Sequence, residues 1–293
     1  GIMTAIEEML SRYSLDNEDQ YKQAFKEIMQ EVVLCGLARS GFFDVAAFTG
    51  GTALRILHGI RRFSEDLDFS LLSPDNDFSF EKYLPYVKRE LNANGFDIEL
   101  GKVKENSAVK SAFIKADTYK LVLNFLSVDP EVFQISKTEK VKVKLEIDTN
   151  PPAGAQYEEI TKLLPSPYIV KCLERPSMFA LKCHALMCRK YIKGRDYYDY
   201  LWFMSQGSEI NYELLKNAFY QTEGEILSQD DIKDHLRRTF HNADIDEVKD
   251  DVRRFLENPD EIEGWTNDIF ENTIKNVEFQ NYAIEAVKRR RCR

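Results

Sequence analysis

Long apolar stretches are missing from this 293-residue sequence. No run of hydrophobic residues approaches the roughly 20 that a membrane-spanning helix requires, so we expect no membrane partner. The first residues carry neither a basic segment nor an apolar core, and we therefore expect no secretory leader. With 43% hydrophobic and 30% charged residues, the composition is that of a globular protein.

Cysteine and histidine are also scarce. The five cysteines form an odd set without a C-x-x-C pair, which argues against a disulfide framework or a zinc site and favours reduced thiols in the cytoplasm. The four histidines have neither the spacing of a zinc protease nor an evident nucleophile partner. Carboxylates must therefore carry any chemistry.

The acidic balance, a net charge of −9, argues against a protein that coats nucleic acid non-specifically. Basic residues nevertheless gather at Arg61 and Arg62, over 137–144 and over 182–195. A solvated face is the simpler interpretation of any one cluster. Three clusters beside three candidate site segments favour a polyanionic substrate.

Hydrophobic periodicity divides the chain into a mixed part and a helical part. Helical spacing predicts helices over 18–39, 52–58 and 80–92. Short or alternating apolar runs predict strands over 45–48, 62–72, 96–103, 108–116, 119–128 and 140–149. Pro151 and Pro152 are expected to end the sheet, and helices are predicted over 175–191, 194–206, 211–221, 228–241, 244–257 and 264–289. We therefore expect an α+β domain over 1–165 and an all-helical domain over 166–293.

The most informative segment joins a glycine turn to a pair of aspartates. Gly50-Gly51-Thr52 follows an expected strand and opens an expected helix, where backbone N–H groups and a hydroxyl can stabilise a phosphate. Asp66 and Asp68 stand two positions apart on an expected strand, so their carboxylates point the same way. Magnesium pairs one or two carboxylates with substrate phosphates. The two segments together predict a triphosphate held between amides and metal ions.

Nucleotidyl transfer by two metal ions needs one more carboxylate, for the ion that activates the attacking hydroxyl. The clearest strand, 140–149, places Glu146 and Asp148 on its polar face. Glu146 is favoured because it lies mid-strand, and Asp148 stays a candidate. Two solvated carboxylates on an exposed face are the simpler alternative.

These motifs carry a family resemblance. Gly50-Gly51-Thr52 with Asp66-x-Asp68 resembles the signature of the DNA polymerase beta-like nucleotidyltransferase superfamily. The longer string GGTALRILHGIRRFSEDLDFSL is similar to the AbiEii/AbiGii toxin family within it, and VKVKLEIDTNPP and ALKCHALMCRKYIKGRDYYDYLWF agree. The resemblance implies a polymerase-beta-like α+β domain with a mixed or antiparallel sheet, followed by the helical domain.

The resemblance also implies roles for individual residues. The residues expected to bind the NTP are Gly50, Gly51, Thr52, Arg62, Ser64 and Lys182. Those expected to bind Mg²⁺, in a two-metal site, are Asp66, Asp68 and either Glu146 or Asp148. Lys182 is the implied phosphate-contacting lysine, and Asp196 is a further implied catalytic acid. A lysine that extends from a helix edge to solvent and an aspartate that caps the next helix are the simpler alternatives.

Family members act as toxins of toxin–antitoxin pairs in abortive infection, and some transfer nucleotides to the acceptor end of tRNA. The resemblance therefore implies a cytoplasmic toxin with an RNA acceptor, most simply tRNA, and a cognate antitoxin protein. The alternatives are transfer to a small molecule such as an antibiotic, and a non-catalytic nucleotide-binding module. Loss of a metal carboxylate would mark the latter, and Asp66, Asp68 and Glu146 are all present.

Overall fold

The chain divides into two units in the computed structural model, which describes residues 2–101, 104, 107–280 and 291. Unit 1 comprises residues 1–56, 65–150 and 159–172, and unit 2 comprises residues 57–64, 151–158 and 173–293. The chain therefore passes between the units repeatedly. The predicted domain boundary at residue 165 cuts the chain only once, and it stays a prediction.

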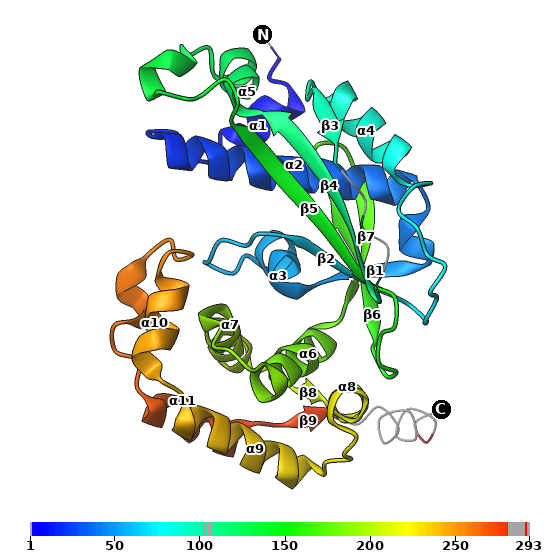
Figure 1. The fold of residues 1–293 in the computed structure, drawn as a ribbon, viewed down its shortest axis with the longest axis vertical. Helices are drawn as coiled ribbons and strands as arrows, with labels where there is room; N and C mark the ends of the chain where they lie inside the picture. The colour runs from blue at the N-terminus through cyan, green and yellow to red at the C-terminus, as the bar shows by residue number, and fades with distance from the viewer. Residues whose placement is uncertain (1, 102–103, 105–106, 281–290, 292–293) are drawn as a thin grey trace. The chain divides into compact units, whose positions relative to one another are not determined.

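A seven-stranded mixed sheet is the centre of unit 1, with the strand order β3-β4-β5-β2-β1-β7-β6 (Figure 1). The strands are β1 Ala46–Thr49, β2 Leu67–Leu71, β3 Ile98–Leu100, β4 Val109–Asp117, β5 Lys140–Asp148, β6 Tyr157–Lys162 and β7 Tyr168–Leu173. Strand β2 is antiparallel to β1 and parallel to β5, whereas β4 is antiparallel to β5. The expected mixed sheet is thereby confirmed.

The helices of unit 1 pack their apolar sides against this sheet and one another. They are α1 Ala5–Leu10, α2 Glu18–Arg39, α3 Gly50–His58, α4 Leu84–Ala93 and α5 Thr118–Leu126. Helix α2 begins after Asn17, whose side chain accepts the N–H of Gln20, and it runs beside α4 (Figure 1). Phe25 and Ile28 of α2 are fully buried. Their spacing is the reason why the prediction for 18–39 matches the helix.

Two strand predictions in unit 1 are wrong. Residues 119–128 form α5, because Asp117 caps a helix by accepting the N–H of Lys120, and Leu121 and Val122 are buried while Leu123 is exposed. The sheet also continues beyond the proline pair at 151–152, into β6 and β7.

The predicted strand 62–72 is too long, because β2 begins only at Leu67. The residues before it pair within unit 2: the N–H of Phe63 donates to the carbonyl of Phe255 at 2.7 Å, and Arg62 forms an isolated bridge with Leu256. Asp66 therefore lies in a loop that leads into β2.

Unit 2 is built mainly from helices, as predicted. They are α6 Arg175–Cys188, α7 Gly194–Ser205, α8 Tyr212–Glu223, α9 Gln229–Asn242, α10 Ile245–Arg253 and α11 Asn267–Thr273. Aromatic rings fill their core, where Tyr200 contacts Phe179, Phe240 and Phe270. A two-stranded parallel sheet, β8 Ile210–Asn211 with β9 Phe279–Gln280, adds to the expected all-helical part.

The last predicted helix, 264–289, is only partly found. Helix α11 ends at Thr273, and the chain then forms a short 3-10 turn and β9. Residues 281–289 lie outside the described residues.

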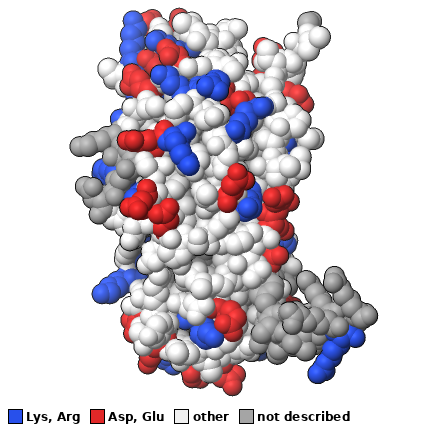
Figure 2. Space-filling view, turned by 90° about the vertical axis from the view of Figure 1, so that its right-hand side faces the viewer, with Lys and Arg blue, Asp and Glu red and all other residues white. Residues whose placement is uncertain are grey.

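The surface mixes charges of both signs. On the face that Figure 2 shows, the described acidic and basic side chains are interspersed, and neither sign forms a large continuous area. None of the described helices is long and apolar enough to cross a membrane. An anionic ligand on this face would therefore meet small groups of cations and not one extended basic area.

Candidate active site

The glycine turn lies directly against one of the two aspartates. Strand β1 ends at Thr49, which pairs with Asp68 of β2, and α3 begins at Gly50. Gly50 has a φ of +79°, and a Cβ there would lie 2.8 Å from Oδ2 of Asp68. A side chain at Gly50 would therefore force the carboxylate to move. The turn and the carboxylate can approach only because this position is glycine.

Two buried side chains hold the loop that carries Asp66. The Thr52 hydroxyl donates to the carbonyl of Asp66, and Nε2 of Gln30 on α2 donates to the carbonyl of Glu65 at 2.9 Å. Thr52 is 1% exposed and Gln30 is fully buried. We call this pair of donors, Gln30 and Thr52, the loop clamp. Thr52 was expected at the nucleotide phosphates, but its hydroxyl is used on the backbone of the aspartate loop.

The register between β2 and β5 separates the two candidates for the third carboxylate. Asp68 pairs with Glu146, whereas Asp148 pairs with Ser70. Neighbouring strands lie about 4.8 Å apart, so Glu146 is beside Asp68 on the same face of the sheet. The Asp148 carboxylate instead accepts the N–H of Asn150 at 2.9 Å. The structure brings together Asp66, Asp68 and Glu146.

A lysine joins these carboxylates. Nζ of Lys144 lies 2.5 Å from Oε1 of Glu146, and the pKa of Lys144 is raised by this hydrogen bond and by the charges of Asp66 and Asp68. The pKa of Asp66 is raised, first by burial and then by repulsion from Glu146, while Lys144 and Lys26 lower it. Three carboxylates thus face few cations, an environment that a divalent cation would compensate.

Asp66, Asp68 and Glu146 offer oxygen donors to a cation. Among the described residues, however, no group of three or more His, Cys, Asp or Glu side chains is placed to hold a metal ion by itself. Magnesium does not need such a group, because it keeps several waters and takes one or two carboxylates together with substrate phosphates. The oxygen-only donors of Asp66, Asp68 and Glu146 match that preference.

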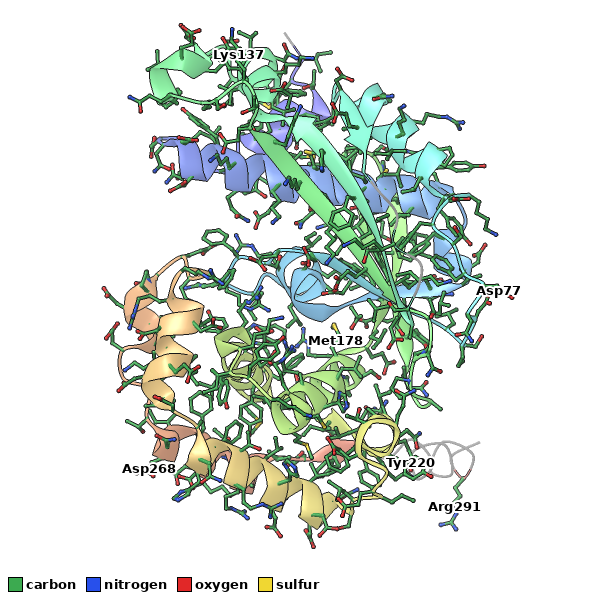
Figure 3. The ribbon with its side chains drawn as sticks, viewed as in Figure 1. Asp77, Lys137, Met178, Tyr220, Asp268 and Arg291 are labelled. Carbon is green, nitrogen blue, oxygen red and sulfur yellow. The ribbon has the colours of Figure 1, made fainter. Side chains whose placement is uncertain are left out.

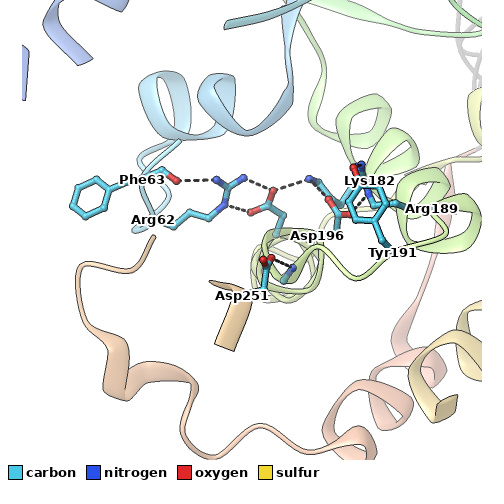
Figure 4. Close-up of polar contacts among 9 residues, drawn as sticks. Arg62, Phe63, Lys182, Arg189, Tyr191, Asp196 and Asp251 are labelled. Atoms are coloured by element: carbon cyan, nitrogen blue, oxygen red, sulfur yellow. Dashed lines mark hydrogen bonds and ion pairs between the residues drawn. The ribbon is translucent and has the colours of Figure 1, made fainter. Parts of the chain in front are cut away.

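The predicted site residues of unit 2 lie in a chain of alternating charges (Figure 4). The Arg62 guanidinium binds the Asp199 carboxylate through two contacts of 2.5 and 2.6 Å. Nζ of Lys182 lies 2.8 Å from Asp199 and 3.0 Å from Asp196. Nε of Arg189 lies 2.9 Å from the other oxygen of Asp196. We call these five residues the ion-pair chain.

Three members of the ion-pair chain are buried, and Lys182 and Arg189 are partly exposed. Arg62 is 3% exposed, Asp196 2% and Asp199 0%. Burial alone would raise the pKa of Asp199, but Arg62 and Lys182 lower it to about 2. Burial likewise opposes the charge on Lys182, and the two aspartates raise its pKa. Asp199 and Lys182 therefore keep their charges at neutral pH.

These contacts differ from several expected roles. Arg62 was expected at the nucleotide, yet its guanidinium is occupied by Asp199 and by the carbonyl of Phe63 at 3.0 Å. Ser64 is 4% exposed, and its hydroxyl finds no partner within the described residues. Asp196 does not cap α7, whose first N–H, that of Gly194, is bound by Asp251 at 2.6 Å.

Comparison with known proteins assigns the family. Residues 32–272 match the sequence profile of the nucleotidyl transferase AbiEii toxin of type IV toxin–antitoxin systems. The chain belongs to the AbiEii family. No curated protein sequence matches it significantly.

Solved structures add a likeness in fold. MenT4, a nucleotidyltransferase toxin from Mycobacterium tuberculosis, is 16% identical with a TM-score of 0.50, over 93% of this chain and 99% of that chain. JHP933 from Helicobacter pylori is 19% identical with a TM-score of 0.48, over 89% of this chain and 90% of that chain. At these identities the likeness concerns the fold alone.

Membership in the AbiEii family confirms the predicted enzyme class. The protein is a nucleotidyltransferase of a toxin family, with the mixed α/β fold that the sequence predicts. The roles of individual residues stay predictions, and the geometry above shows which of them can act together.

Gln30 in unit 1 contacts the loop that carries Asp66, and Asp199 in unit 2 contacts Lys182, but neither was predicted from the sequence. Lys144 and Arg189 were predicted only as members of basic clusters. Strand alternation could have found Lys144, which shares a face of β5 with Glu146. Helical spacing could have found Asp199, three positions after Asp196 on α7. Gln30 lies in an apolar helix, and only its burial shows that it matters.

Proposed function

We propose that this protein transfers a nucleotidyl group from an NTP to an RNA acceptor in a magnesium-dependent reaction. The observation that carries the proposal is the alignment of Glu146 with Asp68 on neighbouring strands, directly beside the Gly50 turn. Carboxylates and turn amides at one edge of a sheet suit a triphosphate together with its cations. The AbiEii family supports the transfer chemistry.

In this proposal the chain's own residues bind and orient the triphosphate. The turn at Gly50 and Gly51 offers backbone N–H groups to the phosphates. Asp66, Asp68 and Glu146 would hold magnesium, which when bound would supply charge stabilisation at the phosphates and at the acceptor hydroxyl. The acceptor oxygen bonds to the α-phosphorus, the bond to pyrophosphate breaks, and the hydroxyl proton passes to a site carboxylate. The loop clamp keeps Asp66 in place during this exchange.

The acceptor and partners are proposed on family grounds. The family description as a type IV toxin supports a co-encoded antitoxin protein. An RNA target, most simply tRNA, is proposed from the resemblance to family members that transfer nucleotides to tRNA. Among the described residues, Cys35, Cys183 and Cys188 form no disulfide, which supports a reducing compartment such as the cytoplasm. A small-molecule acceptor is an outcome that the following experiment can reveal.

The test measures how much label from each NTP is incorporated into total RNA in the presence of Mg²⁺. Asp66→Asn, Asp68→Asn and Glu146→Gln should each abolish labelling, with Tm nearly unchanged because repulsion among the carboxylates is relieved. Asp148→Asn is the matched control, since it removes the same charge two residues away and should keep most activity. Full activity in the Asp66 or Asp68 variant would refute the assignment. An active protein that labels no RNA would point to a small acceptor instead.

A further inference from the structure

Unit 2 contains a small pocket lined by cations, between the α6–α7 connection and the end of α9. Its volume is about 180 Å³, and its wall includes Arg189, Lys190, Tyr191, Lys193, Asp196 and Thr239. Such a volume is below the roughly 300 Å³ of typical small-molecule sites, whereas one water occupies about 30 Å³. The pocket therefore suits a compact ion with a few waters and excludes a whole nucleotide.

Lys193 is the residue that makes this pocket suitable for an anion. Its side chain is half-buried, and its ammonium forms no ion pair or hydrogen bond among the described residues. Its pKa is lowered, first by burial and then by the cations Arg195 and Lys182, while Asp196 raises it. A desolvated ammonium among like charges is unfavourable, and a bound anion would relieve it.

No acid in the pocket wall is available to Lys193. Asp196 is the acid of the wall, and it already binds Lys182 and Arg189 at 3.0 and 2.9 Å. Arg189 also donates to the Tyr191 hydroxyl at 2.8 Å, which fixes its guanidinium in the wall. Lys190 is exposed at the rim. The wall thus holds three cations against one carboxylate.

Arg195 belongs to the same basic segment but has another role. Its guanidinium lies 4.1 Å from the centre of the Phe255 ring and has a partner elsewhere. In the segment 189–195, Arg189, Lys190 and Lys193 therefore line the pocket, whereas Arg195 packs against Phe255. A variant that removes Arg195 would report on stability, whereas Lys193 reports on the pocket.

We propose that the pocket around Lys193 binds one phosphate group of the polynucleotide acceptor. The identity of the ligand as acceptor rests on the proposed function, whereas binding of a phosphate does not. A phosphodiester is compact, anionic and rich in acceptor oxygens, and lysine binds it as a point charge. The pocket would fix the acceptor strand by its backbone, without reading its bases.

The test compares Lys193→Met with Lys233→Met. Lys233 is a half-buried lysine of α9 in the same unit, and it does not line the pocket. Binding of fluorescent single-stranded RNA is measured over a salt series, together with KM for the NTP. Losing one phosphate contact should flatten the slope of log K against log salt by about 0.7, which is about 5-fold weaker binding at 0.1 M salt. Lys233→Met should change neither quantity.

A second measurement uses orthophosphate alone. Phosphate should raise Tm of the wild type above a chloride control of equal ionic strength, and Lys193→Met should lose this gain. A rise in the NTP KM with an unchanged RNA slope would overturn the proposal in favour of the triphosphate. No effect of Lys193→Met on either ligand would overturn the site itself. If orthophosphate binds through Lys193 but wild-type protein binds no RNA, the RNA acceptor fails while the phosphate site stands.

Discussion

The loop clamp makes a prediction about catalysis that separates positioning from stability. In Thr52→Val a methyl group replaces the hydroxyl, so the side chain keeps its shape and its burial, with Thr52 1% exposed. The carbonyl of Asp66 loses its donor, and a buried polar group left unsatisfied costs about 1–3 kcal/mol. We expect a loss near the lower end, because Asp66 itself is half-buried and water can reach part of the loop.

The effect on turnover should exceed the effect on stability. Asp66 lies in the loop, whereas Asp68 lies in β2 and pairs with Glu146, so a loop that shifts at Asp66 moves its carboxylate relative to the other two. Misplacement by about 1 Å can cost about 100-fold in rate. We therefore expect kcat to fall by about 10- to 100-fold, while KM for the NTP changes less, because the amides of the Gly50 turn are untouched.

The assay measures kcat and KM for nucleotide transfer beside unfolding in urea. Thr52→Ser keeps the hydroxyl and should keep most of kcat, although the lost methyl group lowers stability. Ile114→Val, in the fully buried core of β4, should cost about 0.5–1.5 kcal/mol without lowering kcat. If Thr52→Val has the kcat of Ile114→Val at equal stability, the hydroxyl does not position the loop. Gln30→Met should repeat the behaviour of Thr52→Val.

Two further predictions concern buried charge in unit 2. Arg62→Met leaves the fully buried Asp199 without its bidentate partner and should lower the free energy of unfolding by about 3–5 kcal/mol, measured in urea, and a loss below 1 kcal/mol would contradict it. His58 is held largely neutral, because burial and then Arg175 lower its pKa to about 4 from the ordinary value of 6.5. The unfolded chain therefore binds more protons between these values, and stability is lost as pH falls below 6.5, by about 2 kcal/mol from pH 7 to pH 5. His58→Gln should reduce this difference between pH 7 and pH 5, and an unchanged difference would refute the assignment.

Helices and strands whose apolar residues recur with a strict period could be predicted from the sequence, because that pattern is local. Helix 18–39 is long, and its apolar residues recur at helical spacing beneath α4. Strand β5 alternates throughout, with Val141 and Val143 buried between exposed or half-buried lysines. By contrast, the apolar run 119–128 suits a helix or a strand equally well. The Asp117 side chain caps this segment as a helix, and the strand prediction did not include this cap.

Strand β6 was missed for a related reason. Glu158 and Glu159 are adjacent and exposed on β6, so the strand has no alternation to detect. Strand β6 ends the strand order, and an edge strand can carry such charges because one side is not covered by another strand. The proline pair before it suggested an end to the sheet, whereas it marks only a connection.

The candidate site was predictable where it depends on neighbours along the chain. The glycine turn and Asp68 lie on consecutive strands that pair directly, so the motif contains most of its own geometry. The choice between Glu146 and Asp148 needed the register of β5 against β2, which no local pattern specifies. The role of Gln30 could be identified only from the position of α2 beside the loop, where Gln30 donates to the carbonyl of Glu65. Each of these depends on a contact between distant segments.

Arg62 shows why chemistry alone does not assign a residue. An arginine four positions before Asp66 has the charge that a triphosphate needs, and its sequence position favours that role. In the structure its guanidinium is 3% exposed and paired, because Asp199 accepts two hydrogen bonds from it, and its role at the nucleotide stays a prediction. The same pairing, with the backbone contact from Phe63 to Phe255, explains why residues 57–64 belong to unit 2 although residues on both sides belong to unit 1. The segment that leads into the aspartate loop is therefore anchored by residues far along the chain, at Asp199 and Phe255.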